Sequence, residues 1–207
     1  DYSVLAGTQG YFHHLKLDRI CDQANKFDLP VVIFTEGGGG RPGDIDVKTQ
    51  ITGLHIPSFS SWAQLTGNCL KIAVNNGYCF AGNAVLFGCS DFKIATKNSW
   101  IGMAGPAMIE GGGLGVFEPT DIGPIEVQEK NGVVDYVTEN EEEATLIAKQ
   151  LLSYFQGPIE KFTASDQEQL REMMPEDRRY TYDVRDIIKT LADQDTFLEL
   201  RRKYGES

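Results

Sequence analysis

The stretch that decides the fold is residues 70–96, LKIAVNNGYCFAGNAVLFGCSDFKIAT. Its first part, LKIAVNN, has the length and the continuous apolar character of a strand buried on both faces. The chain then opens into the glycine turn GYCFAG, continues as a helix of small residues, AGNAVLFGCS, and enters a second apolar strand, FKIAT. This order of strand, turn, helix and strand predicts a parallel α/β unit.

The same order occurs upstream. Residues 9–27 place apolar side chains at a period near 3.6, which predicts a helix. The run VVIFT, residues 31–35, has strand length, and its continuous apolar character predicts burial on both faces before it opens into GGGGRPGD. A short helical pattern at 58–67 leads back to the strand at residue 70. The sequence therefore predicts repeated β/α layers.

Downstream of residue 96 the elements become shorter. We expect a strand and turn in NSWIGMAG (98–105), a flexible loop in MIEGGGLG (108–115), and a turn and short strand in NGVVDYV (131–137). A helix is predicted at 141–154, where apolar residues recur on one face.

A change of composition near Gly157 predicts a boundary between a core, residues 1–156, and a connector, residues 157–207. The connector is charged, contains few apolar residues and includes two short amphipathic patterns, at 183–192 and 196–204. We expect it to be a helical linker or docking arm without a core of its own.

The composition restricts the class of protein. The chain has 207 residues, 41% of them hydrophobic, which is enough for one sizeable core. Its formal net charge is −11, and it contains no basic stripe of the kind that binds nucleic acid. No run approaches the ~20 apolar residues that cross a bilayer, and no signal peptide is visible. We therefore expect no nucleic-acid or membrane partner.

The four cysteines also indicate a compartment. None belongs to a CxxC pair, and all four lie among apolar residues, at positions 21, 69, 79 and 89. We expect Cys21, Cys69, Cys79 and Cys89 to be reduced core residues of a cytoplasmic protein rather than a disulfide framework or a zinc site.

Two glycine-rich turns are the candidate sites for chemistry, at residues 38–43 and 77–82. Each follows a predicted buried strand, at the sheet edge where α/β proteins bind ligands. Glycine lets backbone N–H groups approach a ligand oxygen, and two convergent amides would form an oxyanion hole. Either turn alone is also compatible with a simple flexible loop. Residues 38–43 lack the GK[ST] ending of a P-loop, and GGGLG at 111–115 lacks the spacing of a dinucleotide fingerprint, so nucleotide binding is the weaker hypothesis.

Conventional catalytic side chains are scarce. His13 and His14 are adjacent on the first predicted helix and so face different ways. His55 has no nucleophile motif beside it, and Glu110 borders a glycine-rich loop. For all four a structural or solvated role is expected, and no metal site is predicted.

Taken together, residues 73–107 resemble the core of the crotonase superfamily, and within it the carboxyltransferase component of biotin-dependent acyl-CoA carboxylases. Similar segments cover nearly the whole chain: VLAGTQG (4–10), PVVIFTEGGGGRPG (30–43), GPAMIEG (105–111) and NGVVDYV (131–137). Residues 175–200 resemble the family's link between its two halves. The resemblance implies an α/β fold of crotonase-like ββα spiral layers, as a partial N-terminal half of a carboxyltransferase with a helical C-terminal connector.

The resemblance also implies a site. It assigns backbone oxyanion donors to Gly39, Gly40, Ala81 and Gly82. Ala81 is often glycine in carboxyltransferases, and we expect alanine to be tolerated there with a negative φ. Substrate contacts are implied for Arg41, Asn83, Gly105 and Pro106. Separately, Lys71, Lys93 and Lys97 are candidates for phosphate contacts, although lysines at strand margins are usually only solvated.

The function implied is transfer of the carboxyl group from carboxybiotin to the α carbon of an acyl-CoA, through an enolate. Biotin would be held on a carrier protein or domain, with a biotin carboxylase and a biotin carboxyl carrier as partners, in a homo-oligomer of fatty acid metabolism. Val85 stands where the hydratases of the superfamily carry a glutamate, which argues against hydration. Alternatives left open are a biotin-dependent acyl-CoA decarboxylase and a non-catalytic assembly fragment.

Overall fold

The computed structural model describes residues 2–41, 43–44 and 56–205. The chain divides into two compact units. Unit 1 comprises Asp1–Tyr154 with Arg201–Ser207, and unit 2 comprises Phe155–Leu200. Residues from 201 on, which the sequence placed in the connector, therefore belong to unit 1.

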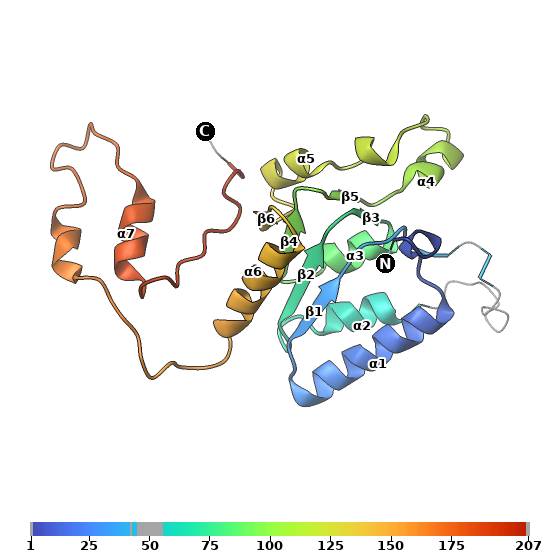
Figure 1. Cartoon of the computed structure of the whole chain (residues 1–207), viewed down its shortest axis with the longest axis horizontal. Helices are drawn as coiled ribbons and strands as arrows, with labels where there is room; N and C mark the ends of the chain where they lie inside the picture. The colour runs from blue at the N-terminus through green and yellow to red at the C-terminus, as the bar shows by residue number, and fades with distance from the viewer. Residues whose placement is uncertain (1, 42, 45–55, 206–207) are drawn as a thin grey trace. The chain divides into compact units, whose positions relative to one another are not determined.

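A four-stranded parallel sheet forms the centre of unit 1 (Figure 1). Its strands, in spatial order, are β1 (Val31–Phe34), β2 (Lys71–Asn75), β4 (Phe92–Thr96) and β6 (Tyr136–Thr138). β2 is buried along its whole length, as its apolar sequence predicts. The expected strands are present in the expected order, and their carboxyl ends meet at one edge because all the pairings are parallel.

A second sheet of two parallel strands was not predicted. It pairs β3 (Tyr78–Phe80), which occupies the middle of the expected GYCFAG turn, with β5 (Trp100–Gly102). Tyr78 packs on Trp100 with ring centroids 4.9 Å apart, an aromatic pair across the two strands. The glycine turn is therefore held as a short strand, which directs the chain back over the edge of the main sheet.

Two groups of helices enclose the cores. α1 (Tyr11–Phe27), α2 (Ser58–Gln64) and α3 (Gly82–Gly88) enclose one cluster of buried side chains. That cluster is Cys21, Ala24, Trp62, Leu65, Cys69 and Leu86. A second cluster lies between α3, β2, β4 and the two-stranded sheet, and includes Ala73, Cys79, Phe87 and Ala95. α3 contributes to both, so its position is fixed from two sides.

The remaining elements of unit 1 close the fold. α6 (Glu141–Ser153) begins at Asn140, whose side chain accepts a hydrogen bond from the Glu143 amide. It buries the apolar face that its sequence predicts. α5 (Ile125–Lys130) and the short 3-10 turns η1 (Leu5–Gly7) and η3 (Pro119–Asp121) complete the unit.

Unit 2 contains the 3-10 helix η4 (Gln167–Arg171) and α7 (Val184–Leu191). The Gln167 side chain donates to the Thr190 carbonyl at 2.6 Å, and Ala164 forms an isolated bridge with Asp193. α7 confirms the helix predicted at 183–192. Across the described residues, no helix combines the length and the apolar composition needed to cross a membrane.

Three local predictions were wrong. β1 is only half-buried and Phe34 is exposed, because β1 lies at the edge of its sheet. The expected loop at 108–115 begins as α4 (Pro106–Gly111), since Pro106 occupies the first helical position, where its fixed φ is favourable. The pattern at 196–204 forms no helix, because Arg201 has a φ of 54° and its amide donates to the Asp135 carbonyl.

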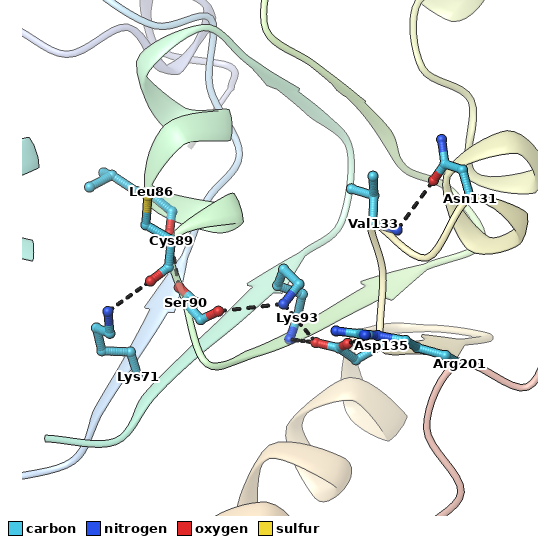
Figure 2. A network of polar contacts seen from close by, with 9 residues as sticks. All are labelled: Lys71, Leu86, Cys89, Ser90, Lys93, Asn131, Val133, Asp135 and Arg201. Carbon is cyan, nitrogen blue, oxygen red and sulfur yellow. Dashed lines mark hydrogen bonds and ion pairs between the residues drawn. The ribbon is translucent and has the colours of Figure 1, made fainter. Parts of the chain in front are cut away.

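Asp135 connects β4 to the segment that returns from unit 2 (Figure 2). Its side chain is 3% exposed and lies 2.9 Å from Lys93 Nζ. The other carboxylate oxygen accepts from Arg201 Nε at 2.6 Å. The Lys93 amide also donates to this carboxylate, at 2.9 Å. A single buried carboxylate therefore satisfies one strand amide and two cations.

We expect Asp135→Asn to lower the free energy of unfolding by about 2–3 kcal/mol, because it leaves the enclosed Lys93 ammonium without its counter-charge. Chemical denaturation measures this. The matched control is Glu139→Gln, which breaks the exposed Lys97–Glu139 pair and should change stability by less than about 0.5 kcal/mol. Equal effects of the two substitutions would contradict the assignment.

The four cysteines differ in burial, whereas the sequence predicted that all of them are buried. Cys21, Cys69 and Cys79 are buried free thiols, as expected, but Cys89 is exposed at the C-terminal end of α3. Burial raises the pKa of the Cys79 thiol to about 12 and that of Cys21 to about 11. The apolar sequence of α3 does not indicate that Cys89, at the end of the helix, lies outside its buried face.

Iodoacetamide at pH 8 should therefore modify Cys89 first, with one adduct per chain. Thiolate is the reactive species, and burial with a raised pKa suppresses it at Cys21 and Cys79. Peptide mass spectrometry of native and denatured protein measures the order of labelling. Early modification of Cys79 in the native protein would be the contrary result.

Candidate active site

Two glycine-rich turns lie against each other at the carboxyl edge of the main sheet. The β1 turn is residues 37–41, and the α3 turn is residues 80–82. Gly37 donates to the Tyr78 carbonyl and accepts from the Phe80 amide, both at 2.8 Å. A Cβ built on Gly39 would lie 2.6 Å from the Ala81 Cβ and 3.3 Å from the Gly82 nitrogen. The structure therefore brings together the two turns that the sequence singled out separately.

The four predicted oxyanion donors fall into two pairs. The Gly39 amide donates to Asn83 Oδ1 at 3.0 Å, and the Ala81 amide donates to the Gly102 carbonyl at 3.1 Å. These two N–H groups are used inside the protein. The amides of Gly40 and Gly82 donate to no group in the described part of the chain, and both residues are at least partly exposed. The donors available to a ligand are therefore those of Gly40 and Gly82.

Ala81 departs from the backbone expected for it. Its φ is 49° with ψ −120°, a conformation that glycine adopts and alanine rarely does. The expectation of a negative φ was wrong. Because the Ala81 amide is tied to Gly102 and Gly82 begins α3, the chain must reverse sharply at this residue. This strained residue joins β3 to the first residue of α3.

The four residues predicted to bind substrate do not all lie at the two turns with free polar groups. Asn83 is buried and all its polar atoms are bonded within the protein. The Arg41 guanidinium donates to the Thr8 carbonyl at 2.9 Å, and so braces the β1 turn from the N-terminal segment. Gly105 and Pro106 begin α4, and a Cβ on Gly105 would touch the Phe80 ring at 3.5 Å. Gly105 thus lies beside the α3 turn, whereas Asn83 and Arg41 have internal partners.

Gln9 is a residue at this site that sequence analysis missed. The sequence placed it in the first helix, but it forms a bridge with Gly40, and its backbone bonds to Gly39 and Arg41 at 2.7 and 2.9 Å. Its side-chain Oε1 is buried and has no hydrogen-bond partner among the residues that the structure describes, and it lies 3.3 Å from where a Cβ on Gly82 would stand. Gln9 also lines a cavity of about 180 Å³ between α1, the end of β1 and α3. No local signal marks it, because the bridge joins residues distant in sequence.

Two of the three lysines considered for phosphate contacts have their ammonium groups bonded within the protein (Figure 2). Lys71 is fully buried, and its Nζ donates to Thr66 Oγ1 at 2.6 Å and to the Cys89 carbonyl at 2.7 Å. Lys93 is paired with Asp135. Lys71 cannot reach a ligand, so its candidacy was wrong, whereas the Lys93 side chain is 12% exposed and its candidacy remains a prediction. Lys97 is exposed beside Glu139, and its assignment remains a prediction.

The histidines and Glu110 take structural or exposed positions. His14 is buried, and its Nδ1 lies 3.0 Å from Ser58 Oγ. Burial lowers the pKa of His14. His13 Nδ1 accepts from the Gly10 amide at 3.1 Å, Glu110 is exposed on α4, and His55 lies outside the described residues. Within the described ranges, no cluster of three or more metal-binding side chains occurs.

Comparison with known proteins establishes the class. The family model described as the carboxyl transferase domain matches residues 1–207. The chain therefore belongs to the carboxyl transferase domain family, and its α/β fold is the crotonase-like fold of that family's structures.

Individual relatives agree with this assignment. The chain is 28% identical, over 99% of its length, to the methylmalonyl-CoA carboxyltransferase 12S subunit of Propionibacterium freudenreichii subsp. shermanii. It is also 28% identical, over its whole length, to a probable biotin-dependent acyl-coenzyme A carboxylase beta2 subunit of Mycobacterium tuberculosis. It spans 40% of the length of each of these two proteins.

Solved structures are similar over nearly the whole chain. A single-chain, multi-domain long-chain acyl-CoA carboxylase matches with a TM-score of 0.92 and 51% identity, over 99% of this chain and 20% of that one. The transcarboxylase 12S hexamer with methylmalonyl-coenzyme A bound matches with a TM-score of 0.82 and 27% identity, over 99% of this chain and 41% of that one.

The strained backbone at Ala81 leads to a stability prediction. Ala81→Gly should raise the free energy of unfolding by about 1 kcal/mol, because relief of a left-handed alanine outweighs the added freedom of glycine in the unfolded chain. Thermal melting measures this. Ala84→Gly is the control in the same helix, and it should destabilise by about 1 kcal/mol or more because Ala84 is buried in helical backbone. Destabilisation by both substitutions would contradict the proposed strain.

Proposed function

We propose that the complete protein containing this chain transfers a carboxyl group between biotin and the α carbon of an acyl-CoA. The observation that carries this proposal is the meeting of the β1 turn and the α3 turn at Gly39 and Ala81, while the Gly40 and Gly82 amides have no partner in the part of the chain that the structure describes. Family membership and the names of the relatives support the same chemistry.

The two amides suit an oxygen that gains negative charge during reaction. In an acyl-CoA this is the thioester oxygen of the enolate, and in biotin it is the ureido oxygen. Backbone N–H groups held in a fixed turn stabilise such charge without first having to reorganise. Gly82 also begins α3, where the helix dipole adds a partial positive charge. Carboxybiotin, when bound, would supply the carboxyl group and be left as biotin, and the residues of this chain would hold and orient the oxygens.

Further features of the proposal concern partners. We propose biotin on a carrier protein or domain, a biotin carboxylase that loads it, and a homo-oligomeric carboxyltransferase in the cytoplasm. The 12S relative forms a hexamer, and the M. tuberculosis relative is described as a biotin-dependent carboxylase subunit. Three buried free thiols are consistent with a reducing compartment.

Decarboxylation is the second candidate. The methylmalonyl-CoA decarboxylase subunit alpha of Veillonella parvula is 24% identical over 99% of the chain. The same pair of amides would serve an enolate formed by loss of carbon dioxide. Net turnover in one direction, measured in the complete protein with its natural carrier, decides between the two. If the chain were only an assembly fragment, the turns would be dispensable in both assays.

The test compares Gly82→Pro with Gly82→Ala in the complete protein. Proline fits the first position of a helix but removes the N–H, whereas alanine adds a Cβ and keeps it. A Cβ at this position would meet the end of the Phe59 ring at 2.9 Å in both variants, so this contact is common to them and only the proline ring and the lost N–H differ. Biotin-dependent loss of the carboxyl group from malonyl-CoA or methylmalonyl-CoA is the assay.

We expect Gly82→Pro to lose ~100- to 1,000-fold in rate, the usual effect of removing one oxyanion donor. Gly82→Ala should lose less than about tenfold, because it retains that donor. Melting curves establish that both variants are folded. Equal rates for the two variants would remove the support for an amide role.

A further inference from the structure

One side chain joins the two turns. Asn83 is the second residue of α3 and directly follows Gly82. Its Oδ1 accepts from the Gly39 amide at 3.0 Å, and its Nδ2 donates to the carbonyls of Thr35 and Glu36 at 3.1 and 3.3 Å. The carboxamide therefore holds the end of β1 on one side and the β1 turn on the other.

This arrangement leaves Asn83 no free donor for a ligand. It is 6% exposed, and both of its donor hydrogens and its oxygen have partners. A Cβ on Gly37 would stand 2.4 Å from Asn83 Nδ2, so the turn is packed tightly onto the side chain. The substrate contact expected for Asn83 is therefore replaced by a contact between parts of the protein.

We propose that Asn83 is a positioning residue, which fixes the Gly40 amide relative to the Gly82 amide. This inference rests on the proposed function. Asn83 and Gly82 are consecutive residues of one helix, so whatever is bonded to Asn83 has a fixed position relative to Gly82. By engaging the Gly39 N–H, Asn83 also makes Gly40 the residue of the β1 turn whose amide is available.

The expected consequence is a loss of rate without a loss of binding. Two donors converge on one oxygen only when their separation is held, and displacement by about 1 Å can cost ~100-fold in rate. Asn83→Ala removes the side-chain link between the β1 turn and α3, and leaves the Gly37 backbone bonds and both amides in place. In the complete protein, we expect kcat to fall between about tenfold and 100-fold, with KM for the acyl-CoA changed less than about threefold.

The matched control is Thr138→Ala on β6. Thr138 is also buried, and its hydroxyl donates to the Asn140 carbonyl at 3.2 Å, but it does not touch either turn. Both substitutions should lower the melting temperature. Only Asn83→Ala should lower the kcat of the folded enzyme. If Asn83→Ala does not fold, Asn83→Ser, which keeps a polar group but cannot supply two donors and an acceptor together, replaces it.

Hydrogen exchange provides a readout independent of activity. The Gly39 amide should exchange faster in the Asn83 variant than in the wild type, while amides of β6 do not change. Wild-type protein that shows no transfer would defeat the proposed function, with the exchange result still reporting on the turn. If the wild type is active but the Asn83 variant keeps its kcat, or keeps the wild-type exchange rate at Gly39, the positioning role is contradicted. The proposed function would not be affected by that result.

Discussion

The site depends on one backbone-to-backbone contact, the exchange of hydrogen bonds between Gly37 and the β3 residues Tyr78 and Phe80. This contact places the chain leaving β1 against the chain leaving β2. It requires glycine, since Gly37 has a φ of 158° and a Cβ there would overlap both Asn83 and the Gly7 carbonyl. The close approach of two main chains is what makes backbone amides, rather than side chains, the chemical groups of this site.

Strain and packing around this contact are linked. Gly39 at a φ of 87° faces Ala81 at a φ of 49°, and the two Cα positions are too close for a second Cβ. The sequence has glycine on the first side and alanine on the second. Buried elements on both sides of α3 hold the strained residue in place, which is how such conformations persist at functional sites.

The chain matches only a portion of the length of its relatives. It spans 40% of the two bacterial relatives described above, yet the described residues already bring both glycine turns together. The segment that returns from unit 2 is attached to β4 and β6 through Asp135. The ion pairs of Asp135 with Lys93 and Arg201 therefore connect the sheet that supports the turns to the residues that follow unit 2. None of these three residues belongs to either turn.

The sequence by itself determined the order of strands and helices, since apolar runs and a 3.6 period identify β2, β4, α1 and α6. It also singled out the two glycine turns as candidates, and it indicated the family. Only the tertiary structure decided which amides are available, because Asn83 and Gly102 are remote in sequence from the N–H groups of Gly39 and Ala81 that they engage. Contacts between segments remote in sequence also explain the burial of Lys71, the β3–β5 sheet and the bridge of Gln9 to Gly40. Each depends on pairing between distant segments, and local propensity carries no record of such pairing.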